Sequence, residues 1–132
     1  MTTAHTTTDN KAVVQQALAA LLASGDVDAL ASVLTDDFVH HRPDASAGKE
    51  EWLAAVRAAY GHIAGMQVDV GHMLADGDLV MLHSRRRLPE GGPEITVVDI
   101  WRFAGGRIAE AWEIIEPTAE AAAHMAWWAL PA

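Results

Sequence analysis

Residues 96–117, TVVDIWRFAGGRIAEAWEIIEP, constrain the fold of this chain more than any other stretch. They predict two β-strands joined by a turn at the double glycine 105–106. Each apolar strand contains one carboxylate, Asp99 in the first and Glu113 in the second. A carboxylate inside a strand is unfavourable unless it is paired or lines a cavity. The two-residue period of a strand puts Asp99 on the face of Trp101, and we expect this face to form one wall of a pocket.

The composition of the chain limits the kinds of molecule that it can be expected to bind. The 132 residues include 18 acidic and 9 basic side chains, so the net charge of −9 argues against nucleic acid and anionic membrane surfaces. The absence of Cys excludes disulfides and Cys-ligated metal. No apolar run reaches membrane-spanning length, and residues 1–8 lack the features of a signal peptide. We expect one cytoplasmic domain over residues 1–132, with a disordered tail at 1–8.

Apolar residues at helical spacing predict three helices in the first half of the chain. The first begins at residue 8 or 9 and ends at Gly25, the second follows a cap by Asp26, and the third covers residues 49–60. A short strand over 38–41 and a turn at 42–44 separate the second helix from the third.

The apolar period changes to two after residue 66. Strands are expected over residues 66–74, 79–88, 95–103 and 107–116, and their short links predict an antiparallel meander. Helices followed by such a sheet indicate an α+β fold, a cone whose open mouth would suit a small molecule. Residues 118–132 are expected to form a C-terminal extension with a short helix. This segment is expected first to cap the core, and closing the cone mouth or extending a dimer interface are the alternatives.

The strand register decides which side chains meet Asp99. A hairpin centred on Gly91 would place His83 opposite Asp99, where a hydrogen bond would orient the imidazole and raise its pKa. A strict two-residue loop at 105–106 would place Trp112 opposite Asp99, whereas a three-residue loop or a bulge would place Glu113 there. Both alternatives remain open, because a slip of one residue reverses the faces of a strand.

Three segments together resemble a known family: SGDVDALASVLTDDFVHHRPD, GDLVMLH and VVDIWRFAGGRIAEAWEIIEP. Over residues 10–117 the chain is similar to the SnoaL-like polyketide cyclase family of the nuclear transport factor 2-like superfamily. That superfamily also contains ketosteroid isomerases, limonene epoxide hydrolases and non-catalytic binding proteins. The resemblance therefore implies a cone-shaped α+β barrel without metal or cofactor, and leaves the reaction open.

The resemblance also implies roles for single residues. Asp99 lies where the isomerases place a protonated carboxyl that donates a hydrogen bond, and Glu113 where epoxide hydrolases and cyclases place an acid/base carboxylate. Arg42 replaces the isomerase base before the proline, which argues against ketosteroid isomerisation. Val97 stands where the epoxide hydrolases have an arginine.

The candidate catalytic residues are Asp99, Glu113, His83 and His41. Each has a structural alternative. Asp99 can be a buried carboxylate satisfied by His83 or an arginine, and Glu113 can be a solvated outer-face residue or a partner to Arg102. The histidines can stabilise the core or a turn. His40 points away from His41 in a strand, so only one of them can line the pocket, and His41 is the one expected to do so. The candidate substrate-binding residues, which can equally be plain core, are Leu18, Trp52, Val56, Tyr60, Met81 and Trp101.

Two functions fit these residues. The first is a cofactor-free acid/base enzyme that cyclises, isomerises or opens an epoxide in a hydrophobic, polyketide-like substrate. The second is a non-catalytic protein that binds a hydrophobic ligand in the same pocket. A metal site of His41, His83 and Asp99 is a weaker alternative, because their spacing is not diagnostic. We also expect a homodimer formed through the outer sheet face around Ile100, Arg102 and Trp112.

Overall fold

The computed structural model describes residues 7–89 and 91–118. Predictions for residues 1–6 of the tail and for the extension beyond 118 lie outside this part of the chain. The elements, in chain order, are α1 (Thr7–Ser24), α2 (Val27–Ser32), β1 (Leu34–Arg42), β2 (Ala45–Gly48), α3 (Lys49–Ile63), β3 (Gln67–Asp76), β4 (Leu79–Arg87), β5 (Ile95–Ala104) and β6 (Arg107–Pro117). None of the described helices is long and apolar enough to cross a membrane. The cytoplasmic location stays a prediction.

The described strands form one sheet in the order β2-β1-β6-β5-β4-β3, in which β1 and β6 are parallel and the other neighbours antiparallel. The predicted α+β class and the meander β3–β6 are confirmed. The sheet is wider than predicted, because β1 is longer than expected and joins β6, and because β2 was missed. The sequence of β2, ASAG, has no apolar alternation, and its strand conformation comes from pairing with β1.

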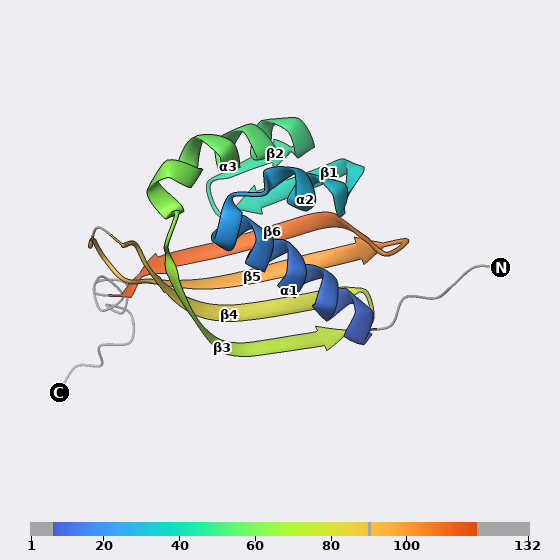
Figure 1. Cartoon of the computed structure of the whole chain (residues 1–132). Coiled ribbons are helices and arrows are strands. Elements are labelled where there is room, and N and C mark those ends of the chain that lie inside the picture. The colour runs from blue at the N-terminus through green and yellow to red at the C-terminus, as the bar shows by residue number, and fades with distance from the viewer. Residues whose placement is uncertain (1–6, 90, 119–132) are drawn as a thin grey trace.

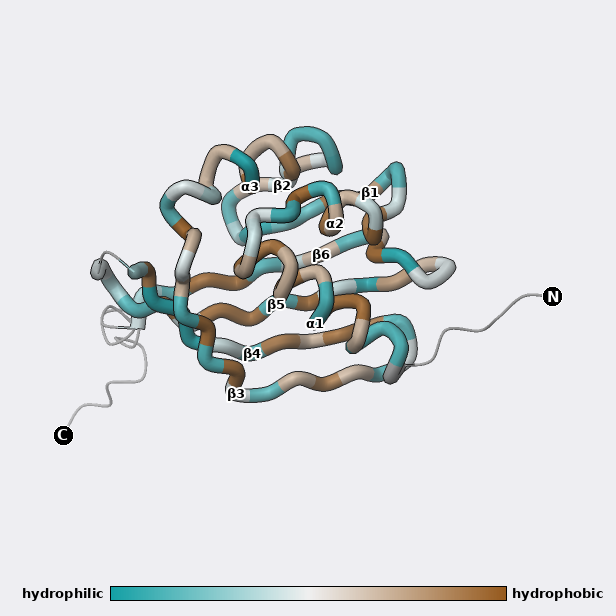
Figure 2. The backbone as a smooth tube through the Cα atoms, in the orientation of Figure 1, coloured by the Kyte–Doolittle hydropathy of each residue, from teal (hydrophilic) through white to brown (hydrophobic). Residues whose placement is uncertain are grey.

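The three helices lie on one side of the sheet (Figure 1). Helix α1 crosses β3 and β4, while α3 packs on β1 and β2. We call the helix-facing side of the sheet the inner face; it carries Val97, Asp99 and Trp101, which are buried. The other side is the outer face, with Met81 and Ile100 paired across β4 and β5. Apolar segments recur in the helices and in the strands beneath them (Figure 2).

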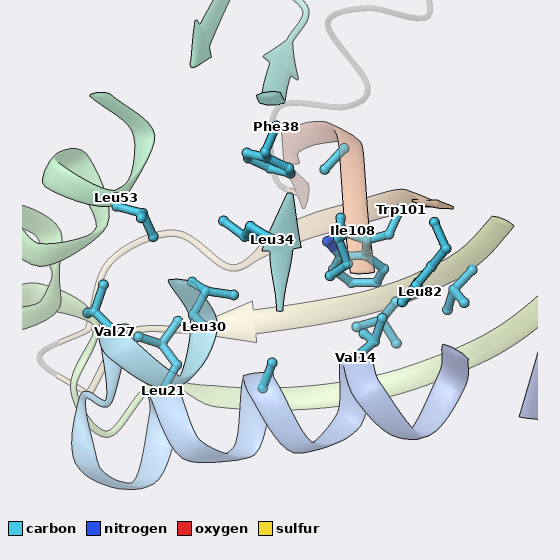
Figure 3. Packing of buried hydrophobic residues seen from close by; sticks show 14 residues of the cluster. Val14, Leu21, Val27, Leu30, Leu34, Phe38, Leu53, Leu82, Trp101 and Ile108 are labelled. Carbon is cyan, nitrogen blue, oxygen red and sulfur yellow. The ribbon is translucent and has the colours of Figure 1, made fainter. Parts of the chain in front are cut away.

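The core lies between the helices and the inner face. Val14 and Leu21 point from α1 toward the sheet, where Leu82 and Trp101 meet them, and Phe38 fills the space near β1 (Figure 3). These side chains are nearly free of solvent, and burying each contributes about 1.5–3 kcal/mol of transfer free energy. Two polar residues of the inner face, Ser84 and Asp99, are also buried.

The β5–β6 hairpin combines both features that the sequence left as alternatives. Ala104 pairs with Arg107, so the loop has two residues, and both glycines have positive φ, 58° and 82°, as a type I′ turn requires. The register then shifts by one residue between Arg102 and Phe103, which places an extra residue, Ala109, in β6. Glu113 consequently pairs with Asp99, and the bulged alternative is confirmed.

The predicted pairing of His83 with Asp99 is wrong. Leu82 lies opposite Asp99, and His83 lies opposite Val98 on the outer face. The last pair before the loop is Arg86 with Ile95, so the loop is not symmetric about Gly91 as assumed. A difference of one residue is enough to turn the imidazole to the other side of the sheet.

Candidate active site

A cavity of about 600 Å³ lies between α1, α3 and the inner face of the sheet. Its walls are mostly aliphatic and aromatic, and they include Leu18, Trp52, Val56 and Trp101, four of the six predicted substrate-binding residues. The charged and imidazole side chains that line it are His40, Arg42, Glu51, Arg86, Asp99 and Glu113. An apolar pocket with a few convergent polar groups is the usual form of a small-molecule site.

Arg86 links the two carboxylates of the cavity. Its Nη2 lies 2.5 Å from Oδ2 of Asp99, and its Nη1 lies 4.0 Å from Oε2 of Glu113. Its Nε donates a hydrogen bond to Oγ of Ser84 at 3.1 Å, which orients the guanidinium plane. The Arg86 and Asp99 side chains are only 14% and 8% exposed, so this ion pair is poorly screened by water.

The strand register brings these three residues together. Arg86 follows Val80, Leu82 and Ser84 on the inner face of β4, each two residues apart. Asp99 occupies the inner face of β5 next to it, and the bulge turns Glu113 of β6 to the same side. Three adjacent strands therefore each supply one member of the cluster.

The cluster has two carboxyls and one buried cation between them. Burial raises the pKa of Asp99 to about 7, the Arg86 charge opposes this, and the Glu113 charge adds to it. Burial also raises the pKa of Glu113, against the opposing charges of Arg86 and Arg42. Because the two carboxyls interact directly, they titrate as a pair. Because burial raises the pKa of both, one carboxyl can hold a proton while the other is ionised, so one can donate a proton while the other accepts one.

His40, not His41, lines the cavity, so that prediction is wrong. The His40 side chain is 6% exposed, and its ring stacks on Trp52 with centroids 4.8 Å apart and planes 16° apart. Burial lowers the pKa of His40 to about 4, with smaller contributions from Arg42 and His41. The prediction that only one of the two histidines can face the pocket is confirmed, but the register of β1 against β6 turns His40 inward.

His41 belongs to a separate network on the outer face. Its Nε2 lies 2.6 Å from Oε2 of Glu110, its Nδ1 lies 2.7 Å from Oγ of Ser46, and its ring stacks on Trp112. Arg102 donates to the same Glu110 through Nε and Nη2, both at 3.2 Å. The alternative that paired Glu113 with Arg102 is therefore wrong, because the bulge gives Glu110 that place.

Three other predicted site residues also lie away from the cavity. His83 stacks on His72, with their Nδ1 atoms 3.1 Å apart, and Met81 is 39% exposed on the same outer face. Tyr60 lies with its ring against Gly25, where it packs on the core.

The proposed metal site of His41, His83 and Asp99 is wrong, because Asp99 faces inward while both histidines face outward. The described residues contain no cluster of three or more His, Asp or Glu side chains suited to a metal.

Sequence reasoning missed the roles of Arg86 and His40. Arg85, Arg86 and Arg87 alternate between the two faces of β4, so of these three only Arg86 faces inward. The signal was present in the alternation Val80, Leu82, Ser84, since Arg86 continues it. For His40 no local signal exists, because Phe38 and His40 share a face but either face of β1 could have been the inner one.

Comparison with solved structures shows the same fold. An LEH-like epoxide hydrolase of M. tuberculosis is 23% identical with TM-score 0.68, over 83% of this chain and 84% of that one. IdmH, a candidate polyketide cyclase of Streptomyces antibioticus, is 24% identical with TM-score 0.69, over 89% and 97%. A candidate ketosteroid isomerase of Kribbella flavida is 17% identical with TM-score 0.70, over 83% and 79%.

Sequence comparison places the chain in a family. A search of curated proteins gives no match. The SnoaL-like domain, in contrast, matches residues 14–111, a span that includes Arg86, Asp99 and most of the cavity wall. This protein belongs to the SnoaL-like domain family, with the nuclear transport factor 2-like fold.

Proposed function

We propose that this protein is a cofactor-free acid/base enzyme that acts on a hydrophobic, polyketide-like small molecule. The observation that carries the proposal is the pair of carboxyls, Asp99 and Glu113, bridged by Arg86 in the wall of a largely apolar cavity. Groups with pKa values near the working pH are the effective proton donors and acceptors, and burial moves both carboxyls in that direction.

The two carboxyls would take different roles. Asp99, the more deeply buried, holds the proton and donates it to a substrate oxygen. Glu113 is ionised and takes a proton from a carbon next to a carbonyl, or from a water molecule. Arg86 keeps both carboxyls in place and offsets the negative charge that develops. The proton that leaves Asp99 is replaced by the one taken up by Glu113, so the pair is restored after transfer between them.

Cyclisation by aldol closure, isomerisation and epoxide opening all require this donor and acceptor. The structurally similar proteins include an epoxide hydrolase and a candidate polyketide cyclase, and these descriptions support testing both reaction classes. Suitable probes are a naphthyl epoxide and a naphthalene-bearing β-hydroxyketone, whose retro-aldol cleavage reports the reverse of cyclisation. Both carry an apolar ring system that matches the cavity wall.

Asp99→Asn and Glu113→Gln remove the proton donor and the proton acceptor without changing side-chain size. We expect each to lower kcat on the reactive probe by roughly 10²- to 10⁴-fold, the usual contribution of a positioned acid or base. Glu50→Gln, an exposed residue of α3, is the matched control and should retain wild-type turnover. Unchanged rates in Asp99→Asn and Glu113→Gln, with wild-type turnover measurable, would refute the assignment.

The second candidate function is binding without catalysis. The observation that favours it is the close Arg86–Asp99 pair, which satisfies a buried carboxylate on structural grounds alone. Carboxyl ¹³C shifts followed by NMR against pH separate the two functions. Raised pKa values at Asp99 and Glu113 support the enzyme, whereas ordinary values at both support a binding protein.

A further inference from the structure

The imidazole of His40 is a polar group left without a partner in the cavity. Among the described residues it makes no hydrogen bond or ion pair, and its ring contacts are stacking on Trp52 and a tilted contact with Phe38. The side chain is more than nine-tenths buried, yet it lines the cavity. Among the described residues, Oδ1 of Asn10 is the one fully enclosed side-chain polar atom without a partner, so the His40 nitrogens open into the cavity, where a ligand can pair with them.

His40 meets a ligand as a neutral ring. Its pKa is lowered to about 4 by burial and by the charge of Arg42, so near neutral pH it has one N–H donor and one acceptor nitrogen. A neutral donor suits an uncharged oxygen such as a carbonyl. Stacking on Trp52 holds the plane of the ring, so the direction of the donor is set before a ligand arrives.

The strand pairing places His40 near Glu113, one member of the carboxyl pair. His40 lies beside Ala111 in the parallel pairing of β1 with β6, and Glu113 follows Ala111 on the same inner face. Two residues along a strand span about 7 Å. An oxygen bound at His40 would therefore leave the neighbouring carbons of the ligand close to Glu113, where a proton would be removed.

We propose that His40 is a substrate-binding residue whose N–H donates a hydrogen bond to a ketone oxygen of an otherwise apolar, ring-containing ligand. The aliphatic and aromatic walls bind the ring system, and His40 selects ligands that carry a carbonyl. This inference rests on the proposed function only in taking the cavity as the substrate site. Its test measures binding without turnover, so failure of the acid/base chemistry would leave it standing.

A matched pair of ligands isolates the hydrogen bond. The probes are 2-acetylnaphthalene and 2-ethylnaphthalene, which share the ring system and differ in the carbonyl. By calorimetric titration at neutral pH we expect wild-type protein to bind the ketone more tightly than the hydrocarbon by roughly three- to tenfold, as one neutral hydrogen bond allows. His40→Phe keeps a ring to stack on Trp52 and should abolish that preference, while His40→Gln, which retains an N–H donor, should keep part of it.

A spectroscopic measurement separates direct contact from an indirect effect on packing. In ¹⁵N-labelled wild-type protein, the imidazole ¹⁵N resonances of His40 should shift with 2-acetylnaphthalene and move much less with 2-ethylnaphthalene. His62→Phe, at an exposed site on α3, is the matched control and should leave the preference unchanged. A preference that persists in His40→Phe, unmoved His40 resonances, or no measurable binding of either ligand would each overturn the proposal.

Discussion

Asp99 and His40 affect stability in opposite directions as pH changes. The pKa of Asp99 is about 7 in the folded protein against 3.8 unfolded, so between these pH values only the folded state holds the proton. The free energy of unfolding therefore falls as pH rises through that window. For His40 the folded pKa is about 4 against 6.5 unfolded, so stability rises between those values. In wild-type protein the two effects largely offset each other between pH 4 and 6.5.

Asp99→Asn should separate these two contributions. The amide side chain of this variant cannot titrate, so the variant no longer loses this stability as pH rises. Its free energy of unfolding relative to wild type should increase by roughly 3 kcal/mol between about pH 4.5 and about pH 7.5. Urea unfolding at several pH values measures this difference. Glu50→Gln should follow wild type throughout. Parallel curves for Asp99→Asn and wild type would show that Asp99 titrates normally in the folded protein.

Arg86 illustrates what a single residue contributes when its partners are distant in sequence. From the sequence, either His83 or an arginine could satisfy Asp99, and Val97 stands where the resemblance to the epoxide hydrolases would place an arginine. The structure supplies an arginine from β4. Arg86 pairs with Ile95, four residues from Asp99, and its long side chain reaches along the inner face to the carboxylate. The partner of the buried carboxylate thus comes from a neighbouring strand and not from its own.

At the scale of elements, Gly25 couples α1 to α3. Its φ of +66° ends α1, and its N–H bonds to the Leu21 carbonyl oxygen at 2.8 Å, as predicted for a glycine after a helix. A Cβ at this position would lie 2.6 Å from two ring carbons of Tyr60. Two constraints therefore act on one residue: a left-handed backbone and the closeness of an aromatic ring.

Gly25→Ala should destabilise the fold by roughly 1–3 kcal/mol from backbone strain, with a further contribution from the displaced Tyr60 ring. Thermal and urea unfolding measure the loss. Gly61→Ala is the control of opposite sign: it lies inside α3 with open space around it, so about 0.5–1 kcal/mol of stabilisation is expected. In the Tyr60→Leu background, Gly25→Ala should lower the free energy of unfolding by less than it does in wild type, but still by a measurable amount. An equal loss in both backgrounds would show that the Tyr60 ring moves aside without an energetic penalty.

The bulge in β6 shows why the register of a hairpin is hard to predict from its turn. The glycines 105 and 106 correctly indicate a two-residue loop, and by itself this would put Trp112 opposite Asp99. The extra residue enters four positions after the loop begins, where the Ile108 N–H also bonds to the Val33 carbonyl oxygen at 2.7 Å. That contact comes from a part of the chain 75 residues away, so no local pattern reports it.

At the scale of the whole molecule, the outer face carries an apolar row across four strands. Leu74, Met81, Ile100 and Trp112 are successive register partners on β3, β4, β5 and β6. Leu74 is 60% exposed and Met81 39%, and Ile114 beside them is 50% exposed. Exposed apolar area of this kind is typical of an interface, and we propose that a second copy of the chain covers it.

Ile100→Lys places a charge in the middle of this row and should convert a dimer to monomer. We expect wild-type protein to sediment as a dimer at micromolar concentration, and the variant to dimerise at least ~10²-fold more weakly because a buried, unpaired ammonium is costly. Val70→Lys is the matched control: this exposed residue pairs with Ser84, an inner-face residue, so the dimer should persist. Sedimentation of wild-type protein as a monomer would refute the proposed dimer.

The sequence alone determined the three helices, the meander β3–β6 and the α+β class, because helical and strand periods, caps such as Asp26 and turn glycines are local signals. It also identified Asp99 and Glu113 as candidate site residues, because a carboxylate in an apolar strand is unfavourable unless it is paired or lines a cavity. Tertiary structure decided the rest: that His40 rather than His41 faces inward, that Arg86 replaces His83 beside Asp99, and that a bulge brings in Glu113. The physical reason is common to all three. Neighbouring strand residues face opposite sides, so each outcome depends on a one-residue register set by contacts between strands distant in sequence.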